Sequence, residues 1–89
     1  MTGSEFKAIR EFNGISQIKV ANFLGYSTRT PIINAEKEDF LPIKFDNVLI
    51  ELLGKDFSNK EFLSDYISKI PKRFFEKKKR FSLSNFFRI

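Results

Sequence analysis

The side chains of this chain that could take part in chemistry are mostly hydrogen-bond donors and cations, and many lie close together. The run Ser27-Thr28-Arg29-Thr30 sets three hydroxyl groups around one guanidinium. An Arg can bind O6 and N7 of guanine with two hydrogen bonds, or it can hold a phosphate, and the sequence leaves both roles open for Arg29. The chemistry that this run indicates is the binding of a nucleic acid.

Three residues that follow have side chains suited to the same surface. We expect Ile32 and Ala35 to face inward on a helix, which leaves Ile33, Asn34 and Lys37 facing outward. The Asn34 amide matches N6 and N7 of adenine. Ile33 either contacts a thymine methyl group or packs against the following loop, and both roles remain open.

Gln17 and Lys19 are candidates for phosphate contacts at the start of an earlier helix. Gln17 is expected at the first helical position, where its amide and the free backbone N–H groups together can hold a phosphate. Its alternative role is that of a helix-forming residue exposed to solvent. Lys19, one turn further in, is the second candidate for a backbone contact.

Groups for catalysis and metal binding are scarce. The 89 residues include neither Cys nor His, which removes disulfides, thiolate zinc sites and the commonest general base. We interpret Glu36, Glu38 and Asp39 as the end of a helix rather than as an acid/base pair. No apolar run approaches the roughly 20 residues of a membrane span. We therefore expect a cytoplasmic protein that is not an enzyme and holds no cofactor or metal.

The middle of the chain predicts two short helices joined by a tight turn, which is the pattern of a helix-turn-helix. Ser16 is suited to cap a helix over 17–24, and Gly25 can adopt the left-handed conformation that ends it. Thr30 then caps a second helix that runs from Pro31 to about Lys37, because a proline at the first helical position loses no hydrogen bond.

Three further helices are predicted from apolar periodicity. The first covers residues 6–12, and the polar residues 1–5 before it are expected to be frayed. Another covers residues 42–53. The fifth is expected over 59–70, preceded by a capping box from Ser58 to Glu61.

The chain resembles the lambda-repressor-like (Cro/CI, XRE) family of helix-turn-helix DNA-binding domains over residues 6–57. The segment FKAIREFNGISQIKVANFLGYS is similar to the first two helices and turn of that family, IINAE to its I-x-x-I-E motif, and FDNVLIELLG to its later core helix. The chain departs from the family by one extra residue between Tyr26 and Ile32. The acidic pair Glu38-Asp39 also stands where a glycine and a basic residue are common.

The resemblance implies an all-α fold with a helix-turn-helix (lambda-repressor-like). Together with the helix expected over 59–70 and the residues after it, we expect a small five-helix bundle plus a basic, Phe-rich C-terminal extension. The resemblance also implies a transcription regulator, a phage or mobile-element repressor or Cro-like protein that binds double-stranded DNA sequence-specifically as a homodimer on an operator. In such proteins the position of Gln17 contacts a phosphate, and the positions of Arg10 and Glu36 are structural. Without the resemblance, Arg10 is a solvated or Glu-paired side chain.

The chain divides into three parts. A helix-turn-helix core covers 1–57, and an additional C-terminal helix over 58–70 packs on the core or forms a dimer seam. The remaining part, 71–89, is a basic aromatic tail. Residues 1–68 carry eight Lys or Arg against ten Asp or Glu, whereas 69–89 carry eight against one. The tail could therefore supply the positive charge that the core lacks.

Three roles are open for this tail. The basic run Lys77, Lys78, Lys79 and Arg80 suits a DNA backbone or minor groove. The Phe residues suit a partner subunit or another protein. An anionic membrane surface ranks last, because the periodicity from Phe74 to Phe87 is poor for an amphipathic helix. We expect a tail that dimerises and touches phosphate.

A function of a different class also remains open. The chain could be a protein-interaction module, or a DNA-binding antitoxin, whose Phe-rich tail binds a partner protein. A fold does not dictate its function, and the acidic balance of residues 1–68 keeps this alternative open.

Overall fold

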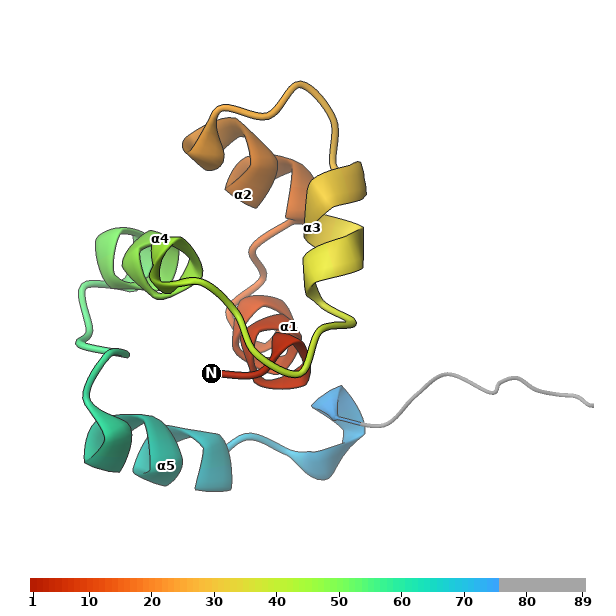
Figure 1. Ribbon diagram of the computed structural model, residues 1–89. Coiled ribbons are helices and arrows are strands. Elements are labelled where there is room, and N and C mark those ends of the chain that lie inside the picture. The colour runs from red at the N-terminus through yellow and green to blue at the C-terminus, as the bar shows by residue number, and fades with distance from the viewer. Residues whose placement is uncertain (76–89) are drawn as a thin grey trace, which may run out of the picture.

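The computed structural model describes residues 1–75, which form five α-helices and one turn of 3-10 helix, with no strand in that range. This confirms the all-helical expectation for the described part of the chain. The longest helix has 11 residues, and none within residues 1–75 is long and apolar enough to cross a membrane. The elements are α1 (Gly3–Phe12), α2 (Gln17–Leu24), α3 (Thr30–Ala35), α4 (Ile43–Leu53), α5 (Lys60–Ser68) and η1 (Lys72–Phe74) (Figure 1).

The helices are arranged around α1, which lies in the middle of the view in Figure 1. There, α2 and α3 form the upper end of the molecule and α5 forms the lower end. α2 packs against both α3 and α4, and η1 packs against α1. The surface of α2 and α3 is therefore separated from α5 by the rest of the fold.

The ends of α2 are those that the sequence predicts. The Ser16 hydroxyl accepts a hydrogen bond from the Lys19 backbone N–H at 3.0 Å, which satisfies one of the free donors at the helix start. Gly25 ends the helix in the left-handed conformation, with φ of 85°. Both predictions for this helix are confirmed.

Two other helices begin one residue later than the sequence predicts. Asn59, not Ser58, caps α5, since its side-chain oxygen accepts from the Phe62 N–H at 2.9 Å. The Ser58 hydroxyl instead donates to the carboxylate of Asp56. Pro42 occupies the capping position of α4 in an extended conformation, so this helix starts at Ile43. A neighbouring polar side chain can move a helix start by one residue without changing the buried face.

The expectation that residues 1–5 fray is wrong. Thr2 and Glu5 form a reciprocal capping box at the start of α1, with hydrogen bonds of 2.9 and 3.0 Å. The buried Gly3 donates its N–H to the Glu38 carbonyl at 2.8 Å, and the Met1 carbonyl accepts from the Leu41 N–H at 3.0 Å. The first residues are therefore tied to the loop between α3 and α4.

One apolar core joins the helices, and its side chains come from every helix except α5. α5 packs onto this core through aromatic rings. Phe57, 1% exposed, meets Tyr66 edge-on at 5.1 Å and Phe62 at 5.5 Å. The Asn13 amide donates to the Tyr66 hydroxyl at 2.9 Å, which also ties α5 to the end of α1. The buried apolar residues are Phe6, Ala8, Ile9, Val20, Ala21, Ile32, Leu41, Phe45, Val48, Leu49, Phe57 and Ile70.

Asp46, in the first turn of α4, carries a buried carboxylate oxygen, Oδ1, that has no hydrogen-bond partner among the described residues. Burial raises the pKa of this carboxyl above its ordinary value of 3.8, and the positive charge of the Met1 amino group partly opposes that shift. The folded protein thus holds this proton more tightly than the unfolded chain does. Ionised Asp46 therefore lowers stability at neutral pH.

We expect Asp46→Asn to stabilise the protein at pH 7, by less than about 1 kcal/mol because solvent screens a half-buried group. The advantage over the parent should be full above the raised pKa of Asp46. It should shrink as the pH falls through that value and vanish below 3.8, where both states of the parent are protonated. Urea unfolding of both proteins from pH 3 to 7 measures this difference. A difference that stays constant with pH would contradict the assignment.

Candidate nucleic-acid interface

The predicted contact residues lie on α2, on the turn before α3, on α3 itself and just beyond it. Seven of them are exposed: Lys19, Ser27, Thr28, Arg29, Thr30, Asn34 and Lys37. Gln17 and Ile33 are half-buried. Because α2 packs on α3 and Gln17 touches the end of α3, these residues follow α3 from its start to its end. We call them the α2–α3 surface.

The start of α3 differs from the sequence expectation. Arg29 occupies the capping position in a helical conformation, and α3 begins at Thr30, so Pro31 is the second helical residue. No side chain caps this end, and the prediction that Thr30 does so is wrong. The Arg29 carbonyl accepts from the N–H groups of Ile32 and Ile33 at 2.9 and 3.0 Å, which closes the first turn. The hydroxyls around Arg29 are therefore not used as a helix cap.

The Arg29 side chain is exposed, and no side chain among residues 1–75 forms an ion pair or hydrogen bond with it. A guanidinium in this state has all its donors available to an external acceptor. Asn34 and Lys37, further along, are also exposed and make no side-chain hydrogen bond within the described part of the chain. These three side chains can meet a ligand without first breaking a hydrogen bond or ion pair to another side chain of residues 1–75.

A buried ion pair fixes the end of α3. Glu36, at the C-terminal cap of α3, accepts from Arg10 Nε at 2.6 Å and from a second guanidinium nitrogen at 3.2 Å. The side chains of Arg10 and Glu36 are only 7% and 5% exposed. A bidentate hydrogen-bonded ion pair of this kind is both strong and fixed in its geometry. Arg10 and Glu36 therefore hold α1 and α3 in one relative position, and of the two roles that the sequence left open for Arg10, solvated or Glu-paired, the second is observed.

The same pair reaches the start of α2. Arg10 also donates to the Ile15 carbonyl at 2.8 Å, and Gln17 Nε2 donates to Glu36 Oε1 at 3.1 Å. One amide N–H of Gln17 is therefore engaged inside the protein, while its amide oxygen and second N–H have no partner among the described residues. Gln17 can orient the start of α2 and still offer a donor outward.

The half-buried Ile33 keeps both of its predicted roles open. Part of its side chain is covered by the protein and part reaches solvent. Ile32, beside it, is completely buried, and Asn34 and Lys37 are exposed, as the sequence predicts. Ala35 is half-buried and packs against the core.

Sequence reasoning missed one contact beside this surface. The Lys44 ammonium at the start of α4 donates to the Tyr26 hydroxyl at 2.6 Å and lies 5.2 Å from the centre of the Tyr26 ring. The contact ties the start of the turn before α3 to α4. Nothing in the sequence signals it, because the two residues are 18 apart and belong to different elements.

Acidic side chains follow the α2–α3 surface directly. Glu38 and Asp39, both exposed, come immediately after Lys37. Residues 1–75 carry eleven Lys or Arg and ten Asp or Glu, so the described part of the chain has almost no excess charge to attract phosphates. The basic run Lys77, Lys78, Lys79 and Arg80 lies outside the described residues.

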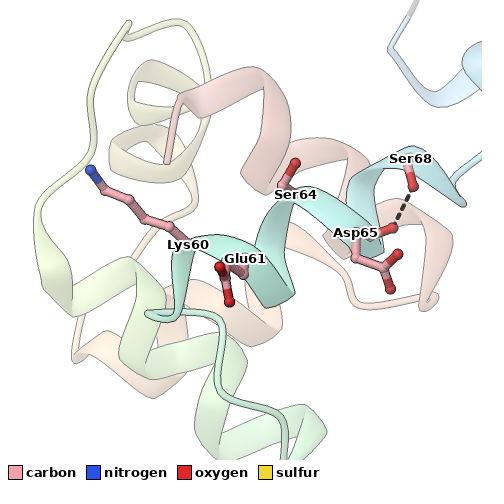
Figure 2. Close-up of a pocket in the computed structure, with 5 residues that line it drawn as sticks. All are labelled: Lys60, Glu61, Ser64, Asp65 and Ser68. Atoms are coloured by element: carbon pink, nitrogen blue, oxygen red, sulfur yellow. Dashed lines mark hydrogen bonds between the residues drawn. The ribbon is translucent and has the colours of Figure 1, made fainter.

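A shallow depression elsewhere on the surface lies along α5. Figure 2 shows its lining side chains, which project from one helix and are all exposed. The hydrogen bond among them runs from the Ser68 hydroxyl to the Asp65 carbonyl, within a single turn. No group of three or more potential metal ligands occurs among residues 1–75. The lining residues are Lys60, Glu61, Ser64, Asp65 and Ser68.

Comparisons of this chain with models of protein families, with curated proteins and with solved structures find no match.

Proposed function

We propose that this chain is a sequence-specific double-stranded DNA-binding transcription regulator that uses α2 and α3 as a helix-turn-helix. The observation that carries the proposal is the combination of a fixed frame with free donors. The buried Arg10–Glu36 pair holds α3, while Arg29, Asn34 and Lys37 stay exposed and available. Free polar side chains on a rigid helix are what base reading requires.

In the proposed mechanism α3 enters the major groove. Arg29 at the start of α3 meets guanine or a phosphate, and Asn34 meets adenine. Gln17 binds a phosphate with the amide N–H that Glu36 leaves free, and so sets the register of α3 on the duplex. Binding as a homodimer would place two half-sites about 34 Å apart, one helical turn of DNA. Occupancy of such an operator would repress transcription by blocking a promoter.

The charges of the described residues predict weak non-specific binding. Non-specific affinity grows with the number of phosphates neutralised, and the acidic pair Glu38-Asp39 opposes the cations next to it. Specific contacts and a second copy would together supply the missing affinity, and the basic residues 77–80 would add to it when they are not paired with acidic residues of the chain.

The test is a selection followed by a binding measurement. The full chain selects from a pool of randomised duplexes, and fluorescence anisotropy then compares the enriched duplex with a scrambled one across a salt series. We expect preferential binding to the enriched duplex, which weakens steeply as salt rises. Equal, weak binding to both duplexes at low salt would overturn the proposal.

We expect Arg29→Ala and Lys37→Ala to weaken binding in different ways. If Arg29 reads guanine, its loss costs about 1–3 kcal/mol on the enriched duplex and much less on the scrambled one. If Lys37 contacts a phosphate, its loss weakens binding to both duplexes and lowers the salt slope by about 1. Lys60→Ala is the matched control, because Lys60 is an exposed lysine on α5 (Figure 2). An equal effect of Lys37→Ala and Lys60→Ala would argue against the α2–α3 surface.

A second candidate function is favoured by one specific observation. Phe40 and Ile43, 81% and 67% exposed, are large apolar side chains whose exposure DNA binding does not explain. A protein-interaction module, or a DNA-binding antitoxin, would use such side chains or the Phe-rich tail for a partner protein. Failure of the selection to enrich any duplex would favour this candidate.

A further inference from the structure

The loop between α3 and α4 presents acidic and apolar side chains next to each other. Glu38 and Asp39 are exposed, Phe40 is 81% exposed, and Ile43 at the start of α4 is 67% exposed. We call these four residues the 38–43 surface. Two large apolar side chains are thus exposed close in sequence to two acidic residues, and a segment that carries both apolar and basic side chains would complement both features.

The backbone holds this surface in place. The Glu38 carbonyl accepts from the Gly3 N–H at 2.8 Å, and the Leu41 N–H donates to the Met1 carbonyl at 3.0 Å. Leu41, between the two exposed apolar residues, is itself buried in the core. The backbone on both sides of Phe40 is therefore held in place, by the hydrogen bond of Glu38 and by the buried Leu41, while the Phe40 side chain stays in solvent.

We propose that the chain's own C-terminal segment, residues 76–89, covers the 38–43 surface. This segment, EKKKRFSLSNFFRI, has five basic residues and one acidic residue, together with three Phe. Lys79-Arg80-Phe81 also has the same order of side-chain types as Glu38-Asp39-Phe40, with two charges of the opposite sign followed by Phe. Charge complementarity and apolar content therefore both match the surface.

The length of the chain permits this contact. The ring of Phe74 packs edge-on against Phe12, near the end of α1, with 5.7 Å between the ring centres. Glu38, in contrast, is hydrogen-bonded through its backbone carbonyl to Gly3, at the start of α1. A helix of ten residues is about 15 Å long. Five extended residues span about 17 Å, so residues 76–80 can bring the basic run to the acidic pair. In Figure 1, η1 and the start of the loop after α3 both lie to the right of α1.

The surface could have other occupants, and the test separates them. A second copy of the chain could supply its own C-terminal segment, or the two 38–43 surfaces could meet each other. The inference does not rest on DNA binding, and its test contains no DNA, so it can fail while the proposed function holds.

The experiment attaches a spin label to the full chain. Because the chain has no Cys, Ser84→Cys gives a single labelling site within the C-terminal segment. We expect the label to broaden the amide NMR signals of Glu38, Asp39, Phe40 and Ile43 at low salt. The charge reversal Glu38→Lys/Asp39→Lys should restore these signals. The matched control Glu51→Lys/Glu61→Lys reverses two other exposed acidic residues and should leave the broadening unchanged.

Two further measurements complete the test. Phe40→Ser should weaken the broadening without disturbing the fold, because Phe40 is almost fully exposed. A mixture of isotope-labelled chain without the spin label and spin-labelled chain without isotope should show no broadening. Broadening in that mixture would assign the surface to a second copy and overturn the proposal. Unbroadened signals at residues 38–43 at low salt, or an equal effect of the two charge reversals, would overturn it as well.

Discussion

Replacing Glu36 with Gln is expected to lower the free energy of unfolding by about 3 kcal/mol, because it removes the carboxylate that pairs most closely with the buried Arg10 guanidinium and leaves only the partly exposed Glu11, 3.6 Å away. The substitution keeps the shape of the side chain, so the loss reports charge rather than packing. Both side chains are less than a tenth exposed, and water cannot replace the missing partner. Since a domain of this size has a total stability near the low end of about 5–15 kcal/mol, the variant should be close to unfolding at 37 °C.

Urea denaturation followed by circular dichroism at pH 7 measures this loss. Asp65→Asn is the control, because it breaks the ion pair between Asp65 and Lys69, whose side chains are 63% and 72% exposed. An exposed pair of this type contributes less than about 0.5 kcal/mol. Equal losses for Glu36→Gln and Asp65→Asn would show that the Arg10–Glu36 pair is solvated, contrary to the structure.

Gly3→Ala is expected to destabilise the protein by about 2 kcal/mol, which is opposite in sign to the usual effect in a helix. Replacing a helical Gly by Ala normally adds about 0.5–1 kcal/mol. Here a Cβ at residue 3 would overlap the Ala35 carbonyl oxygen and would lie 2.6 Å from the carbonyl carbon and oxygen of Glu36. These are backbone atoms at the end of α3, which the buried pair holds in place, so the overlap cannot be relieved cheaply.

The same unfolding measurement tests this prediction, with Ser4→Ala as its control. Ser4 is exposed in the same helical turn, and its substitution should be neutral or slightly stabilising. If Gly3→Ala were as stable as the parent, α1 and α3 could not approach each other as closely in solution as they do in the structure.

The positions of the helices follow from local sequence signals. Apolar periodicity and the caps Ser16 and Gly25 are sufficient to predict α2. The apolar stripe of Phe45, Val48 and Leu49 is sufficient to predict α4. Each of these signals depends on residues within one or two turns of each other, so no knowledge of the tertiary structure is needed. The exposure of Asn34 and Lys37 was predictable in the same way, because Ile32 fixes which side of α3 faces the core.

The contacts that position the α2–α3 surface could not be predicted in this way. Residues 1–5 have a defined structure because they bond to the loop after α3, which is distant in the sequence. The hydrogen bond between Lys44 and Tyr26 likewise joins two elements that are separate in the sequence. The start of α3 at Thr30 reflects the helical conformation of Arg29, which the Thr-Pro pair does not signal. DNA binding by this surface stays a prediction.

The separation of roles along α3 has a consequence for how such a protein could evolve. Within this six-residue helix and its cap, Ile32 and Glu36 are needed for the fold, whereas Asn34 and the following Lys37 are exposed and make no side-chain hydrogen bond or ion pair among the described residues. Substitutions at the second pair should therefore accumulate at little cost in stability. Under selection for a new target, such a chain can change its specificity while its scaffold stays the same.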